Sequence, residues 1–166
     1  MSRLLSIALI CIGTAIFGLT GCEPAPQESA SPDGRAQLAE FENYKDFGRY
    51  VVHVNALTTS QLPADIAQNY GIVRSGNRAL LNVTVLKKSE SLTDMPVAAE
   101  VAVSAANLTG QNKGMKMREV TDGQSIYYIG EASVSNGEVL LFDLDVTPEG
   151  ESEALSLRFK KEFFGG

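Results

Sequence analysis

The chain has 166 residues, with 20 acidic and 14 basic side chains and a net charge of −6 at neutral pH. An acidic protein is repelled by the phosphates of nucleic acids and by anionic lipid head groups, so we expect no nucleic-acid partner. The length is sufficient for one folded domain with its own apolar core.

The first 22 residues have the pattern of an export signal. A basic start at Arg3 precedes an uncharged apolar run from Leu4 to Leu19, which is typical of a secretory signal peptide. A membrane-spanning helix is the alternative, but it needs about 20 apolar residues and glycines dilute this run. The run ends in Leu19-Thr20-Gly21-Cys22, which resembles the lipobox of bacterial lipoproteins. That resemblance implies cleavage before Cys22 and acylation of this residue, and two or three acyl chains anchor a protein stably to a membrane.

These features predict three segments: a signal peptide over 1–21, a tether over 22–42 and a folded domain over 43–166. The tether contains several prolines and small polar residues and too few large apolar side chains to offset the entropy of ordering. Lipid attachment through Cys22 indicates a periplasm-facing protein of the cell envelope. Glu23 stands where many lipoproteins retained in the inner membrane carry Asp, which favours the outer membrane.

The cysteine content limits the chemistry of the mature domain. Cys11 leaves with the signal and Cys22 carries lipid, so we expect no disulfide, no thiolate nucleophile and no cysteine-based metal site. The fold must then be held together by its own core. Loss of Arg3 makes the net charge of the mature chain about −7.

From about Tyr44 the apolar residues alternate with polar ones, which is the period of β-strands. Asp122-Gly123 and Pro148-Glu149-Gly150-Glu151 are turn signals that predict two hairpins. Seven alternating runs lie at 50–56, 79–85, 97–105, 115–120, 126–131, 139–146 and 154–163. About seven strands at this spacing predict an all-β fold, an immunoglobulin-like antiparallel β-sandwich.

One short helix is expected between the first two strands, from Leu62 to Gly71. Pro63 suits a first helical position and Gly71 suits a C-terminal cap. The spacing of Leu62, Ile66 and Tyr70 predicts one inward-facing stripe, and we expect the helix to cross between the layers of the sandwich.

The last hairpin has a predictable register. If the numbers of paired residues sum to 301, Phe142 faces Phe159 on the apolar side and Asp143 faces Arg158 on the other side. A slip of one residue would turn one strand's apolar side chains toward water, so burial favours this register.

Five stretches of the domain resemble a bacterial family of unknown function, DUF4426. The resemblance covers about Phe47 to Phe164 and implies a secreted immunoglobulin-like sandwich, with no known activity and no catalytic residues. The stretches are Asn55-Ala56, Tyr70 to Val83, Asn107 to Gln111, Ile126 to Ile129 and Leu157 to Phe163.

The best candidate binding loop contains Arg74, Ser75, Asn77 and Arg78. Two guanidinium groups with nearby hydroxyl and amide donors suit a carboxylate or phosphate. The structural alternative is that Asn77 bonds the turn backbone while the arginines pair with acidic side chains of neighbouring strands.

Met115 and Met117 are weak candidates for a copper site, because soft sulfur ligands suit Cu(I) and alternate strand residues share a face. Packing in the core explains the same spacing, and His53 is the only histidine. Asp143 and Asp145 lack the order of a calcium loop, so we expect a solvated acidic edge. We expect no cofactor and no resident metal.

We therefore expect a non-catalytic binding or assembly module, with a protein of the envelope as its candidate partner. No nucleophile, base and glycine-rich loop stand at a usable spacing, so we do not expect an enzyme. The alternatives are a periplasmic carrier of a small ligand or copper ion, and a hydrolase whose site is assembled from distant strands.

Overall fold

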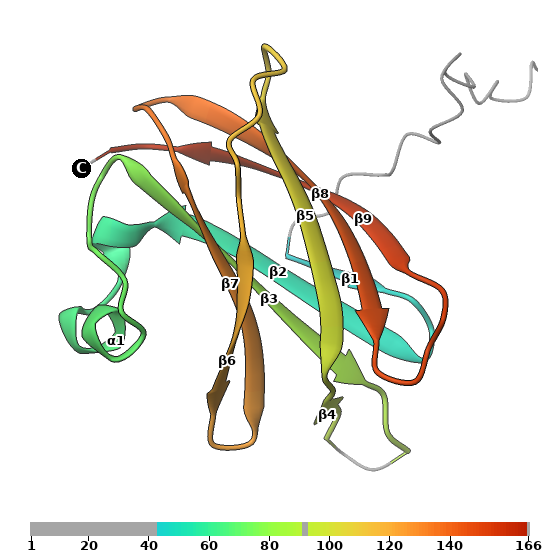
Figure 1. Cartoon of the computed structure of the whole chain (residues 1–166). Helices are drawn as coiled ribbons and strands as arrows, with labels where there is room; N and C mark the ends of the chain where they lie inside the picture. The colour runs from blue at the N-terminus through green and yellow to red at the C-terminus, as the bar shows by residue number, and fades with distance from the viewer. Residues whose placement is uncertain (1–42, 91–92, 166) are drawn as a thin grey trace, which may run out of the picture. The chain divides into compact units, whose positions relative to one another are not determined.

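The computed structural model describes residues 43–90 and 93–165, which form a sandwich of two antiparallel sheets (Figure 1). The expected signal peptide, Cys22 and the tether lie outside the described residues. The first sheet contains β1 (Tyr44–Asp46), β2 (Tyr50–Thr58), β3 (Arg78–Lys87), β4 (Met95–Pro96), β6 (Met117–Asp122) and β7 (Ser125–Ser133). The second contains β5 (Ala99–Asn107), β8 (Glu138–Pro148) and β9 (Leu155–Phe163).

The seven long strands are the seven that the alternation predicted, and β1 and β4 are short additions. The sheet orders are β1-β2-β3-β7-β6, with β4 beside β3, and β5-β8-β9. If the long strands are lettered A to G in chain order, these orders become ABED and CFG. This is the arrangement of a constant-type immunoglobulin domain, so the fold prediction is confirmed.

The core lies between the two sheets, and alternate residues of each strand point into it. The rings of Phe142 and Phe159 lie 6.0 Å apart, and Phe163 meets Phe142 edge-on at 6.4 Å. The first sheet contributes Tyr50, Val52, Val54, Ala56, Ala79, Leu81, Val83 and Val85, and the second contributes Ala105, Leu140, Phe142, Leu144, Val146, Leu157, Phe159 and Phe163. Burying each large side chain stabilises the fold by about 1.5 to 3 kcal/mol, so this cluster is the main source of stability.

A buried tyrosine links the two sheets through polar contacts. The Tyr128 hydroxyl of β7 accepts a hydrogen bond from the backbone N–H of Ala99 in β5 at 2.7 Å. The same hydroxyl donates to Glu119 Oε2 at 3.1 Å. Burial raises the pKa of Tyr128 above its ordinary value, so the phenol stays protonated and keeps this bridge at neutral pH.

The helix lies at the expected place in the sequence, but it packs on the outside of the sandwich and does not cross between its layers. A 3₁₀ turn (Thr59–Gln61) and α1 (Ala64–Asn69) join β2 to β3, with Pro63 preceding the first helical residue. Gly71 has φ of +64° and ends the helix as predicted. None of the helices in residues 43–90 and 93–165 has the length and apolar character needed to span a bilayer.

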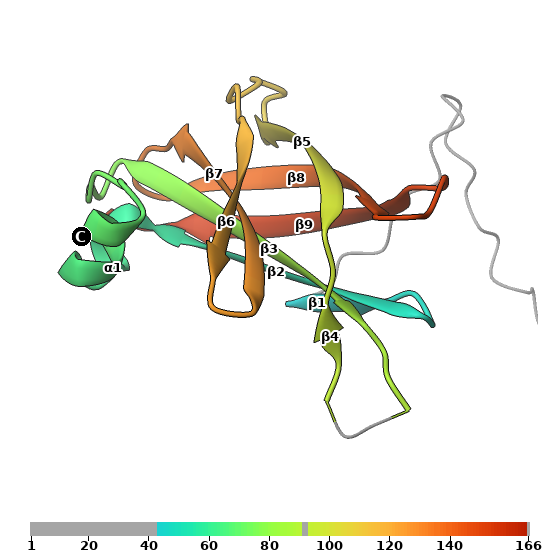
Figure 2. The same ribbon diagram turned by 60° about the horizontal axis from the view of Figure 1, so that its bottom comes forward.

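The expectation that α1 crosses between the layers is wrong. β2 and β3 are neighbours in one sheet, so the helical segment returns the chain over that sheet's outer surface (Figure 2). There Ala67 and Ile72 pack against Leu80 and Ile129, which point away from the main core. Ala67, rather than Ile66, is the helical residue that is fully covered.

Both predicted hairpins form. In β6–β7, Asp122 pairs with Ser125 and Gly123 has φ of +59°, which places the turn at Gly123 and the following residue. In β8–β9, Phe142 pairs with Phe159 and Asp143 with Arg158, as the predicted register requires.

Apolar packing should contribute more to the last hairpin than its ion pair does. Arg158 Nε lies 2.7 Å from Asp143 Oδ1, but both side chains are at least 30% exposed, so we expect a coupling of only about 0.2 to 1 kcal/mol. Phe159→Ala opens a cavity in the core and should cost roughly 3 to 5 kcal/mol. Double-mutant cycles by urea unfolding measure both couplings, and a larger value for the ion pair than for Phe142 with Phe159 would contradict this ranking.

Candidate functional site

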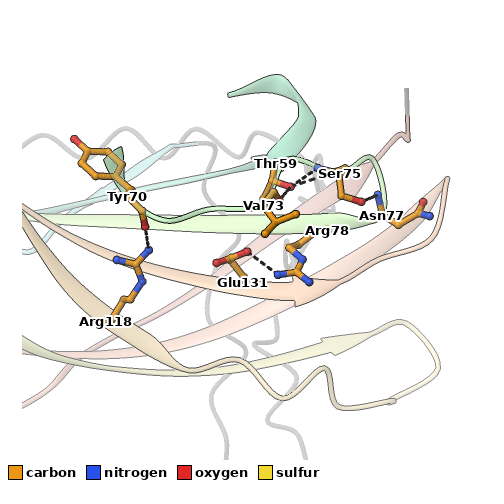
Figure 3. A network of polar contacts seen from close by, with 8 residues as sticks. All are labelled: Thr59, Tyr70, Val73, Ser75, Asn77, Arg78, Arg118 and Glu131. Carbon is orange, nitrogen blue, oxygen red and sulfur yellow. Dashed lines mark hydrogen bonds and ion pairs between the residues drawn. The ribbon is translucent and has the colours of Figure 1, made fainter. Parts of the chain in front are cut away.

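The predicted binding loop joins α1 to β3 and is hydrogen-bonded to a buried threonine (Figure 3). Thr59 is completely buried. Its hydroxyl lies 2.9 Å from the carbonyl oxygen of Val73 and 3.1 Å from that of Ser75, and accepts the Ser75 N–H at 2.9 Å. The Thr59 hydroxyl therefore satisfies backbone groups of the loop and holds them in place.

The two arginines of the loop have partners within the domain, yet remain exposed. Arg74 Nη2 donates to the carbonyl oxygen of Ser60 at 2.7 Å. Arg78 Nη1 lies 3.1 Å from Glu131 Oε2 on the adjacent strand β7. Each guanidinium has five N–H donors, and these bonds use one of them in each case, so both can still donate to a ligand or partner.

Ser75 and Asn77 shape the loop mainly through local bonds. The Asn77 N–H donates to Ser75 Oγ at 3.1 Å, and the Asn77 carbonyl oxygen accepts from the N–H of Val134 at 3.0 Å. The pairing of Arg78 with Glu131 agrees with the structural interpretation, whereas Arg74 binds a carbonyl oxygen and these bonds of Asn77 are made by its backbone. The four predicted residues of the loop lie together because they are close in sequence, and they bring Val73, 66% exposed, to the surface beside them.

Tyr70, which precedes this loop in the chain, is hydrogen-bonded to β6. The Tyr70 hydroxyl donates to Asp122 Oδ2 at 3.1 Å, and Arg118 donates to the Tyr70 carbonyl oxygen (Figure 3). The hydrogen bond to Asp122 raises the pKa of Tyr70. These contacts fasten the end of α1 to the sheet, so the loop that follows starts from a fixed position.

The stretch from Asn107 to Gln111 forms a second polar network, which the sequence did not reveal. Asn107 Oδ1 accepts the backbone N–H groups of Thr109 and Gln111 at 3.2 and 2.9 Å, while its Nδ2 donates to Glu138 Oε1 at 3.0 Å. Lys113 Nζ lies 2.5 Å from the same oxygen, and the side chains of Lys113 and Glu138 are only 12% and 14% exposed. The hydrogen bond from Lys113 holds the pKa of Glu138 at about 2.

The two methionines pack over a glycine on the inner face of the first sheet. A Cβ atom added to Gly130 would lie 2.6 Å from Met117 Sδ and 3.1 Å from Met115 Sδ. Both side chains pack against the main core. His53 is an exposed residue between the buried Val52 and Val54, so it points from the opposite face of the sheet. Core packing therefore explains Met115 and Met117, and the one histidine does not join them.

Metal-ligating groups are also dispersed elsewhere. Within 43–90 and 93–165, no three His, Cys, Asp or Glu side chains are close enough to hold a metal ion together. Asp143 pairs with Arg158, and Asp145 Oδ1 accepts a hydrogen bond from Ser156 Oγ at 2.6 Å.

A hollow of about 580 Å³ lies where the β1–β2 turn meets the loop before β9. Two of its charged groups, Arg49 and Glu151, bind each other. Arg49 Nη1 lies 3.0 Å from Glu151 Oε1, and the Tyr50 hydroxyl donates to that oxygen at 2.9 Å. The hydrogen bond from Tyr50 lowers the pKa of Glu151. This cluster closes one end of the sandwich.

A smaller hollow of about 300 Å³ lies on the outer surface of β2 and β3. Sequence reasoning missed it, because the polar strand residues that line it are ordinary outward-facing side chains that stand far apart in the sequence. The pairing of β2 with β3 brings them together. The hollow is lined by Asn43, His53, Val54, Asn55, Asn82 and Thr84.

Comparison with known proteins identifies one family. The family described as a domain of unknown function (DUF4426) matches residues 44–165. A crystal structure of a DUF4426 family protein from Pseudomonas aeruginosa PAO1, at 2.09 Å resolution, is similar to this chain with 33% sequence identity and a TM-score of 0.64. The similarity covers 75% of this chain and 96% of that chain. No curated protein matches this chain.

The Glu138 network should make stability depend on pH in a defined window. The pKa of Glu138 in the folded protein, about 2, lies below the ordinary 4.5. The stabilisation by its carboxylate is therefore present above pH 4.5 and is lost as the pH falls toward 2. Urea unfolding of the parent and of Glu138→Gln should therefore give unfolding free energies whose difference becomes smaller as the pH falls from 4.5 to 2. A difference that stays constant from neutral pH to pH 2 would show that the carboxylate charge does not stabilise the fold.

Proposed function

Since this chain belongs to the DUF4426 family, whose name assigns no activity, we propose a function from its own residues. It is a lipid-anchored module of the cell envelope that faces the periplasm and binds a protein partner without catalysing a reaction. The observation that carries this proposal is Leu19-Thr20-Gly21-Cys22 at the end of an apolar run. The proposal includes the tether expected over residues 22–42, between the lipid on Cys22 and the domain that contains β1 (Tyr44–Asp46).

The loop from Val73 to Arg78 is the surface that best suits a protein partner. It combines an exposed apolar side chain, Val73, with the exposed guanidinium groups of Arg74 and Arg78. Arginine is enriched among the residues that dominate binding energy in protein interfaces. The remaining N–H donors match carboxylates, so the expected partner is an envelope protein with acidic side chains at its contact surface.

The position of the loop also supports this role. Thr59 holds the loop backbone and Arg118 holds the carbonyl of Tyr70, so the loop is fixed before any partner arrives. A surface that is already ordered loses less conformational entropy on association. The outer membrane is the proposed location, as Glu23 follows Cys22.

Cys22→Ser should remove the membrane anchor without unfolding the domain, because the thiol lies in the sequence well before β1. Fractionation of cell envelopes after a high-salt wash, with mass spectrometry of the N-terminus, measures both acylation and membrane retention. The parent should remain in the membrane fraction with acyl chains on Cys22. A Cys22→Ser protein that still partitions with membranes would refute anchoring through this residue.

A photo-crosslinking amino acid at Val73 tests the partner surface in intact envelopes. The same amino acid at Met95, which is 64% exposed in a different part of the sheet, is the matched control. We expect one adduct that forms only from position 73 and weakens with Arg74→Ala. The substitution should cost less than about 1 kcal/mol in stability, because it removes one surface hydrogen bond. The same adducts from both positions, or no effect of Arg74→Ala, would refute the assignment.

A further inference from the structure

Four polar side chains form a block on the outer face of β2 and β3, away from the core. The register places His53 opposite Thr84 and Asn55 opposite Asn82. Side chains directly opposite on neighbouring strands are close enough to contact the same small ligand. Together they line the hollow of about 300 Å³, which is the lower end of the usual range for ligand pockets.

Asn82 has an unsatisfied group in this block. Its Oδ1 atom is buried and has no hydrogen-bond partner among residues 43–90 and 93–165. Buried acceptors are almost always satisfied in folded proteins, because leaving one without a donor is unfavourable. Asn82 lines the hollow, so a hydroxyl group supplied from outside the chain would satisfy this oxygen once the amide turns toward the hollow.

The residues around the hollow indicate an uncharged ligand. Amide, hydroxyl and imidazole groups line it, and none of the lining residues is Lys, Arg, Asp or Glu. An anionic ligand would need a cationic partner there, whereas amide side chains both donate and accept hydrogen bonds, as sugar hydroxyl groups do.

An aromatic ring stands at the edge of the block. Tyr44 pairs with His53 across β1 and β2, their ring centroids are 5.7 Å apart, and Tyr44 is 59% exposed. An exposed aromatic face beside hydrogen-bonding side chains suits a sugar ring, which has an apolar face and a polar edge.

We propose that this hollow, lined by His53, Asn55, Asn82 and Thr84, binds a neutral sugar unit of a glycan. The amides of Asn55 and Asn82 bind the hydroxyl groups, and Tyr44 packs on the ring. The site is distinct from Cys22 and from the loop at Val73 to Arg78, so it does not depend on the proposed partner surface.

The test is NMR titration of the ¹⁵N-labelled full chain in a zwitterionic detergent, which avoids sugar-headed detergents that would compete. Chitotetraose, cellotetraose and maltotetraose are the neutral probes, and tetragalacturonate is the anionic comparison. At least one neutral probe should shift the side-chain amide signals of Asn55 and Asn82 in a saturable manner. Tetragalacturonate should bind more weakly than that probe.

Asn82→Ala should weaken this binding by about tenfold, as expected for loss of one well-placed hydrogen bond. It removes an unsatisfied acceptor, so the unfolding midpoint should not fall. Tyr44→Ala, at an exposed position, is a second variant that should also weaken binding. Asn69→Ala on the exposed surface of α1 is the matched control and should bind as the parent does.

The proposal is wrong if none of the three neutral probes binds saturably at millimolar concentration, or if tetragalacturonate binds best. It is also wrong if both Asn82→Ala and Tyr44→Ala bind as tightly as the parent. None of these results would alter the expected behaviour of Cys22→Ser or of the crosslinker at Val73. Failure of the glycan site is therefore separable from failure of the proposed envelope function.

Discussion

Burial of the inward-facing side chains between the two sheets is the interaction on which the rest of the structure depends. Val83 of β3 and Phe142 of β8 are both completely buried in this layer. Successive side chains of a strand point to opposite faces of the sheet, so the residues that face the core also determine which residues face outward. Apolar packing thus selects the register of each hairpin and leaves the outer surface to other roles.

The outer surface of the first sheet has two parts with different chemistry. At Leu80 and Ile129 it is apolar and is covered by α1, which therefore packs on the outside of the sandwich. Two residues after Leu80 on the same face, Asn82 begins the polar hollow, where its buried Oδ1 has no hydrogen-bond partner in the part of the chain that the structure describes. The proposed ligand site is thus the part of this surface that the fold leaves with an unmet hydrogen bond. The loop at Arg74 differs, because Thr59 accepts the Ser75 N–H and the exposed Arg74 uses one of its donors on the Ser60 carbonyl oxygen.

Much of the fold was predictable because burial and alternation act locally. The β8–β9 register followed from matching two apolar faces, and Gly71 was recognisable as a helix end because positive φ suits glycine. The placement of α1 was not predictable from its own residues: the apolar stripe predicted a buried face without identifying what covers it. Leu80 was the missing signal, since it is an apolar residue on the polar face of a strand. Asn55 and Asn82 are far apart in sequence, so only the pairing of β2 with β3 reveals them as one site.

The central claim is that inward residues hold the fold while outward polar residues are free to serve binding, and adjacent positions of β3 test it most directly. Unfolding free energies of Val83→Asn and Asn82→Val compare the two faces of one strand. The account predicts a loss of several kcal/mol for Val83→Asn, because it puts an unsatisfied amide into the core, and no loss for Asn82→Val. Equal losses for the two variants would show that Asn82 is part of what holds the sandwich together and would contradict the account.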